Sequence, residues 1–284
     1  MAEPPPSTAR LRKIGRTLRQ IREDAGHTLK YAGRLIERSD SSLSLIEKGT
    51  QQLRLRDLKH ILDVYGVGPD VHHALMTLAE QQQQSGWWED FKHTVSPAAL
   101  DHASLESSAS TIDLSETSLI PGLLQTEDYA RSVIRAGLIG DQLARTDRLV
   151  AYRMARQQAL KSGHLLRLKV TIDEAALRRI RGGRQVMRAQ LGKIVEEADR
   201  DNIKVHVLPF ACEIDPSYIG SFQIISISRP AILSVVLMDH LTGRWILEEK
   251  SDVASYHEKF THVVNTALDE TRSRALIQGI ASEL

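Results

Sequence analysis

The sequence predicts a mainly α-helical protein whose C-terminal part adds a mixed α+β domain. Through the first 84 residues, apolar residues recur every three or four positions between glycine and proline stops, which indicates short helices. From Gly163 on, segments of alternating apolar residues appear, and alternation indicates strands. The 284 residues, of which 42% are hydrophobic and only 5% aromatic, suffice for two or three helix-rich units.

Four segments are expected along the chain. Residues 1–8 contain three consecutive prolines and predict a disordered arm, because proline cannot continue a helix. The remaining segments are a five-helix domain at 9–84, a connector and helical region at 85–162, and an α+β regulatory or interaction domain at 163–284.

The first helix is expected from about Thr8 to Gly26. Its apolar residues step by three or four positions, from Leu11 to Ala25. Its other face is basic, which predicts either a solvated surface or contact with phosphates. The basic residues are Arg10, Arg12, Lys13, Arg16, Arg19 and Arg22.

The stretch from Thr28 to Gly49 predicts two short helices joined by a tight turn. The expected ranges are 28–36 and 40–48. Small Ala32 and Gly33 allow close helix approach, Ser39 suits the start of the second helix, and glycine at 49 suits a left-handed end. This layout indicates a helix-turn-helix, whose second helix enters the major groove of DNA, so segment 9–84 is interpreted as a DNA-binding domain.

Two further helices complete this domain. One carries Leu58, Ile61 and Leu62 and stops at residues 66–69. The other is expected to be capped by Asp70 and to continue through glutamines 81–84 into a connector.

The connector region is expected to be mostly helical. Adjacent Trp87 and Trp88 are expected at a seam between domains or subunits, because their rings are amphipathic. Helices are predicted at 99–112, 126–139 and 141–162, with a possible strand at 111–120 and a turn at 121–122.

Residues 163–284 alternate between strand and helix patterns. Strands are predicted at 166–172, 203–207, 221–227 and 232–238, with an edge strand near Trp245. Helices are predicted at 173–181, 184–199, 252–267 and 268–282.

Charge and cysteine usage limit the class of protein. The net charge is +1, but residues 1–70 carry 13 Lys and Arg against 9 Asp and Glu, and the rest carries 24 against 27. The positive excess therefore coincides with the helix-turn-helix. A lone Cys212 excludes an intramolecular disulfide framework. No membrane span or secretory segment is apparent, so a cytoplasmic protein without membrane association is expected.

Several motifs resemble a known family. They are GWW at 86–88, PGLLQTEDYAR at 121–131, DEAALRR at 173–179 and VLPF at 207–210, together with the helix-turn-helix at 28–49. These resemble XRE-type, phage-repressor-like regulators of the actinobacterial WhiJ-like group, often described as antitoxin-like. The resemblance implies a cytoplasmic transcription regulator, usually dimeric, often encoded beside a small partner protein whose effect it can counter.

Three positions depart from that family's pattern. The first motif helix usually opens with Gln, and here it opens with Leu29. The turn usually has Gly, and Glu37 would cost about 1 kcal/mol if the left-handed backbone is kept. The recognition helix usually carries Arg or Lys, the commonest base contacts, but here none precedes Lys48.

Candidate DNA contacts follow from analogy with the phage-repressor motif. Asp40, Ser41 and Leu45 would face base edges, with Asp40 accepting from cytosine and Leu45 packing on a thymine methyl. Phosphate contacts would come from Thr28, Lys30, Ser42, Ser44 and Lys48. The alternative is that the serines only cap or are solvated, and that Asp40 only complements the helix dipole.

Three functional hypotheses remain open. The first is a homodimer that binds double-stranded DNA at an inverted repeat, with half-sites about 34 Å apart or a multiple of that. The second is an antitoxin-like module that sequesters a small partner protein, suggested by the serine-rich, acidic recognition helix. The third makes the C-terminal domain a sensor of an unknown small-molecule effector.

An enzyme is not expected. The histidines form no metal-ligand spacing with nearby acids, and Cys212 has no local catalytic motif. Gly182-Gly183 predicts a turn rather than a phosphate loop. No cofactor, metal or catalytic residue is therefore predicted.

Overall fold

The computed structural model describes residues 7–161, 166–213, 218, 220–228, 231–240 and 243–284. The chain separates into two compact units, Met1–Gly86 and Trp87–Leu284. Residues 1–6 of the expected arm and the expected change of period at Gly163 lie outside the described residues. The last two residues of the arm are structured, since the Ser7 hydroxyl donates to Gly49 O (2.6 Å) and Thr8 caps the first helix.

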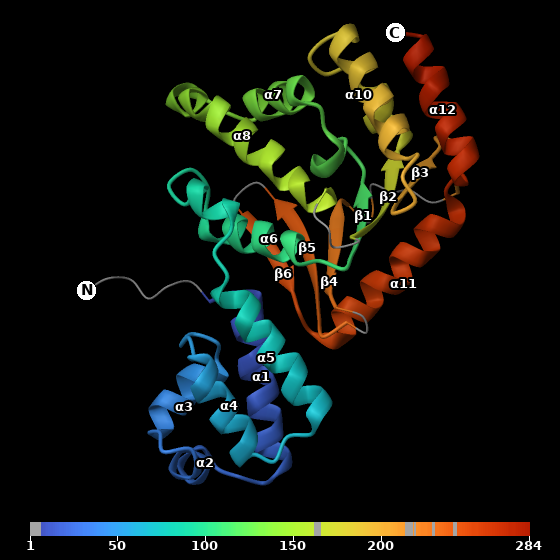
Figure 1. Cartoon of the computed structure of the whole chain (residues 1–284). Helices are drawn as coiled ribbons and strands as arrows, with labels where there is room; N and C mark the ends of the chain where they lie inside the picture. Colours follow the sequence, from blue (N-terminus) through green and yellow to red (C-terminus); the bar gives the residue numbers. More distant parts are fainter. Residues whose placement is uncertain (1–6, 162–165, 214–217, 219, 229–230, 241–242) are drawn as a thin grey trace. The chain divides into compact units, whose positions relative to one another are not determined.

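The N-terminal unit consists of five helices, as predicted (Figure 1). They are α1 (Ala9–Asp24), α2 (Leu29–Leu35), α3 (Asp40–Glu47), α4 (Leu55–Val64) and α5 (Pro69–Gln83). The apolar positions identified by their spacing form the core: Ile14, Leu18, Leu43, Ile46, Leu58, Ile61, Leu62, Leu75 and Leu78 are all buried.

Hydroxyl groups begin the first three helices. Thr8, Thr28 and Ser39 each accept a hydrogen bond from the backbone N–H three residues later, which satisfies a donor that the helix itself cannot. The cap expected at Asp70 is wrong. Gly68 is the N-cap of α5, Pro69 occupies the first helical position, and Asp70 lies in the first turn.

Two glycines bring α1 against the end of α3. A Cβ on Gly15 would lie 2.4 Å from Ile46 O, and one on Gly49 would lie 2.7 Å from the Arg12 Cα. Gly49 also has φ +67°, in the left-handed region. The backbones can therefore touch only because both positions lack a side chain.

The C-terminal unit is built on one six-stranded sheet in the order β3-β2-β1-β4-β5-β6. Its strands are β1 (Thr111–Glu116), β2 (Arg167–Asp173), β3 (Ile203–Leu208), β4 (Phe222–Ile227), β5 (Leu233–His240) and β6 (Gly243–Leu247). β1, β2 and β3 pair in parallel, whereas β4, β5 and β6 continue antiparallel from the other side of β1.

Helices and short 3-10 turns surround the sheet (Figure 1). The α-helices are α6 (Pro97–Ser107), α7 (Glu127–Ala136), α8 (Thr146–Arg156), α9 (Glu174–Arg178), α10 (Arg184–Glu197), α11 (Lys250–Thr266) and α12 (Glu270–Ser282). The 3-10 turns are η1 (Trp87–Phe91), η2 (Gly122–Leu124), η3 (Gly140–Arg145) and η4 (Gln157–Leu160). The single helix expected at 141–162 is thus η3, α8 and η4 in succession.

The two faces of the sheet have different partners. On one face, Phe222, Ile224 and Val236 pack against Val253 and Phe260 of α11. Alternate residues point to the other face. There Gln223 of β4 meets the α6 side chains His102 and Glu106.

The expected boundary near residue 163 does not separate two units. β1, from the expected connector region, is a central strand between β2 and β4, so residues 87–284 form one unit. Sequence reasoning placed β1 outside the α+β part because its strand pattern is short and followed by helices. Trp87 and Trp88 lie in this same unit and pack against a cluster of Phe91, Ala103 and Tyr152.

Candidate nucleic-acid interface

Helices α2 and α3 form the helix-turn-helix that the sequence predicts. A Cβ on Gly33 would lie 2.7 Å from Arg38 O, so the turn folds directly over α2. Glu37 adopts φ 56°, which retains the left-handed conformation usually given to glycine. The turn is further held by the Arg38 guanidinium, which donates to Asp57 of α4 (2.9 Å).

A buried ion pair fixes the end of α3 to α1. The Arg22 guanidinium donates to both carboxylate oxygens of Glu47, at 2.6 and 2.8 Å, and also to His27 O at 2.8 Å. The hydrogen bond that Arg22 donates to Glu47 raises the pKa of Arg22, and both side chains are less than a tenth exposed. Because α3 is anchored by this pair and by the backbone contact at Gly15, its outer face is presented rigidly.

The predicted contact residues divide by exposure. Six are exposed: Thr28, Lys30, Asp40, Ser41, Leu45 and Lys48. Ser42 and Ser44 are half-buried, and the Ser42 hydroxyl donates to Gln51 (3.3 Å). Leu45 is 47% exposed, which is unusual for a leucine on a packed helix and leaves it free for an apolar contact.

Two of the predicted polar contact residues, Asp40 and Thr28, already make local hydrogen bonds. Asp40 Oδ1 accepts from the Ser41 N–H (2.9 Å), and Thr28 Oγ1 accepts from the Tyr31 N–H (3.2 Å). Asp40 also lies in the first turn of α3, as its alternative role at the helix dipole requires, whereas the capping role of Thr28 was not predicted. These hydrogen bonds leave the second carboxylate oxygen of Asp40 and the hydroxyl hydrogen of Thr28 available for other partners.

The basic residues of α1 do not form one solvated face. Arg10 and Arg22 are buried, and the remaining four include only one exposed side chain, Arg19, which pairs with Glu23 (2.9 Å). Periodicity could not show this, because a pattern of charge does not reveal an internal partner such as Glu47. Exposed cations around the motif lie on α2, at the end of α3 and at or near the start of α4, and they are Lys30, Arg34, Lys48, Arg54, Arg56 and Lys59.

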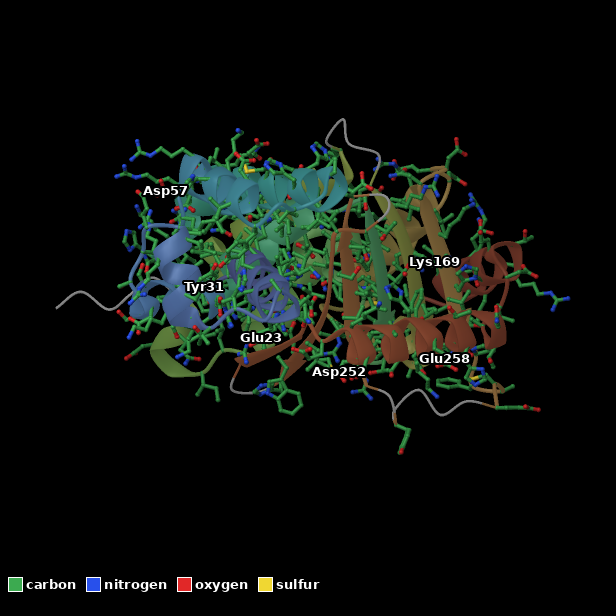
Figure 2. All side chains as sticks on the ribbon, turned by 90° about the horizontal axis from the view of Figure 1, so that it is seen from below. Glu23, Tyr31, Asp57, Lys169, Asp252 and Glu258 are labelled. Carbon is green, nitrogen blue, oxygen red and sulfur yellow. The ribbon has the colours of Figure 1, made fainter. Side chains whose placement is uncertain are left out.

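Sequence reasoning missed two exposed apolar residues on α2. Tyr31 is 51% and Leu35 40% exposed, and they lie one helical turn apart. Tyr31 (labelled in Figure 2) also packs edge-on against His27. Because Tyr31 and Leu35 are four positions apart, the sequence alone could have indicated that they share one face of α2.

The described part of the chain offers neither a cluster suited to a metal ion nor a helix suited to a membrane. No group of three or more His, Cys, Asp or Glu residues there is arranged to hold a metal ion. None of the helices within the described ranges has the length and apolar character needed to span a membrane.

Two family models match the chain. Residues 13–75 match a helix-turn-helix domain, and residues 99–279 match a domain of unknown function, DUF5753. No curated protein matches the chain. No solved structure matches it either.

The matched motif and its geometry define the class of protein. An XRE-type helix-turn-helix with an exposed second helix makes the chain a DNA-binding helix-turn-helix regulator. Because the second model covers more than half of the chain, the protein belongs to the DUF5753 family.

Proposed function

We propose that this protein is a sequence-specific transcription regulator that acts in the cytoplasm as a homodimer on an inverted repeat. In this proposal it is not an enzyme, and its C-terminal unit responds to a partner protein or a ligand. The motifs at 86–88 and 121–131 support membership of the WhiJ-like group of actinobacterial regulators. The observation that carries the proposal is the rigid α3 with an exposed face of Asp40, Ser41, Leu45 and Lys48.

Each exposed residue has a proposed role in the major groove. Leu45 packs on a thymine methyl, and Asp40 accepts from a cytosine amino group. Lys48 and Lys30 contact phosphates and so set register and affinity without reading sequence. One small helix-turn-helix has too small an interface to be selective, so a dimer with half-sites about 34 Å apart, or a multiple, is proposed.

The test is selection of genomic DNA fragments by the full-length protein at two salt concentrations. Recovery of one inverted repeat, with affinity that falls steeply as salt rises, is expected. Lys48→Ala should weaken binding to all fragments and reduce the salt slope by about 2 for the dimer, whereas Leu45→Ala should relax preference at one base pair of each half-site. Lys250→Ala, an exposed lysine on α11, is the matched control and should change neither.

A second function is favoured by the exposed apolar residues of the motif. Tyr31, Leu35 and Leu45 would suit contact with a small partner protein in an antitoxin-like module. Failure to recover any fragment above background, from folded protein, would contradict the first proposal and favour this one. The neighbouring gene product should then be co-expressed and co-purified with wild type and with Tyr31→Ala.

A further inference from the structure

A cavity of about 240 Å³ lies in the C-terminal unit at the end of β1. Its walls come from β1, β4, β5, β6 and the loop after β1, beside the place where the parallel strands meet the antiparallel ones. Its apolar wall is Leu114, Leu119, Phe222 and Leu237, and its polar wall is Glu116, Ser118, Ser221, Gln223, Asp239 and Arg244. Since a cavity of ~150 Å³ holds one benzene, this one has room for about ten non-hydrogen atoms.

Most charges beside the cavity are already paired. Arg156 of α8 donates to both carboxylate oxygens of Glu106 at 2.8 Å. Arg244 donates to both oxygens of Asp239 and contacts His102, so each of its three nitrogens has a partner. Arg244, the cation on the cavity wall, therefore has little capacity left for an anionic ligand.

Glu116 differs from these groups. It makes no ion pair within the described residues, and only the Ser221 hydroxyl is a hydrogen-bonding neighbour of its carboxyl group. Ser221 is itself fixed, because the Thr117 N–H donates to its Oγ (3.1 Å). Burial raises the pKa of Glu116 to about 7. That pKa of about 7 is the net result, since the hydrogen bond with the Ser221 hydroxyl lowers it, Asp239 of β5 raises it, and Arg153 and Arg156 of α8 lower it.

We infer that this cavity binds a small organic cation, a protonated amine on an apolar body, whose ammonium group pairs with Glu116. The ammonium would supply the hydrogen-bond donors and the positive charge that the Glu116 carboxylate lacks. The apolar body would lie against Leu114, Leu119 and Leu237. An anion in the same place would face the Glu116 carboxylate, because Asp239 is already paired with Arg244.

This location suits an effector, and that regulatory meaning rests on the proposed function. Crevices at the carboxyl ends of parallel strands are recurrent ligand sites in open α/β sheets. Binding itself can be measured without DNA. A failure of amine binding and a failure of DNA binding are therefore separate results.

The test uses three probes of nearly equal size on the full-length protein. Benzylamine, benzyl alcohol and benzoate are titrated by calorimetry at about pH 8, where the carboxyl group is mostly ionised. Benzylamine should bind at least about tenfold tighter than the other two. Equal binding of the three probes, tighter binding of benzoate, or no binding at millimolar concentrations would overturn the inference.

Two variants test whether benzylamine binds at Glu116. Glu116→Gln should remove the preference for benzylamine, whereas Glu258→Gln, an exposed acid on α11 (Figure 2), should retain it. Preference retained in the Glu116→Gln protein would place the amine elsewhere and overturn the assignment.

A pH titration of the unmodified protein gives an independent readout if the variant does not fold. Benzylamine affinity should fall about tenfold from about pH 8 to about pH 6, because the cation must compete with a proton at Glu116. Benzyl alcohol affinity should stay constant. Unchanged benzylamine affinity over this range would contradict the role of Glu116.

Discussion

At the scale of single residues, Glu37 carries a conformational cost in the turn of the helix-turn-helix. Its φ of 56° lies in the left-handed region, where a Cβ is disfavoured. Glu37→Gly should therefore stabilise the N-terminal unit by about 0.5–1 kcal/mol. Amide hydrogen exchange of peptides from 9–83 should slow by roughly two- to fivefold.

The matched control is Glu37→Ala, which removes the carboxylate and keeps the Cβ. It should give no such protection. A gain equal to that of the glycine variant would show that charge, and not backbone conformation, limits the turn.

Glu116 is the second residue whose environment has a measurable consequence. Its folded-state pKa of about 7 is above its usual value of 4.5, so the folded protein retains a proton that the unfolded chain releases between these values. Stability therefore falls as pH rises through this range. In ligand-free protein, Glu116→Gln should raise the melting temperature relative to wild type at about pH 8, with a smaller difference at about pH 5.

Differential scanning fluorimetry across that pH range is the measurement. Glu258→Gln should show no pH-dependent difference, because the residue is exposed on α11. An equal shift at both pH values for Glu116→Gln would indicate a packing effect and not a titration.

At the scale of secondary-structure elements, the main link between α1 and α3 is the Arg22–Glu47 pair. Removing one member of a buried pair leaves the other charge unpaired, so Arg22→Met should lose about 3–5 kcal/mol. The double variant Arg22→Met with Glu47→Leu should recover most of this loss. Urea unfolding of the two proteins is the test, and a double variant no more stable than the single one would contradict the reasoning.

Sequence periodicity predicted the positions of the helices better than it predicted which side chains pack between them. Within each helix, the spacing of apolar residues predicted both the helix and the face that packs into the core, because buried positions recur with the helical period. Ile14 in α1, Leu43 in α3 and Leu58 in α4 are examples, and all three are buried. The burial of Arg10 was not predictable, since charge alone suggests solvent. The helix-turn-helix was located correctly, but the exposure of Tyr31 depends on packing between helices, which a linear pattern does not contain.

At the scale of the whole molecule, the central position of β1 makes residues 87–284 a single folding unit. A fragment of residues 87–284 should retain all six strands and fold, whereas one of residues 163–284 lacks the strand between β2 and β4. That loss exposes two strand edges in the middle of the sheet. Circular dichroism and size-exclusion chromatography should show a folded first fragment and an unfolded or aggregated second one.

The order of strands also explains why the domain boundary was mispredicted. β1 pairs with β4 although more than a hundred residues lie between Leu114 and its register partner Gln223. No local pattern marks a pairing over that distance. Strand segments can thus be recognised from the sequence while their sheet order cannot.

That distant pairing has a consequence for synthesis on the ribosome. The first five helices lie within residues 9–83 and form a compact unit of their own, so they can fold soon after emerging, because the contacts among them do not wait for later parts of the chain. β1 must wait for β4, β5 and β6, which are made near the end of translation. The nascent chain therefore completes its helix-turn-helix before the sheet that contains the proposed amine site exists.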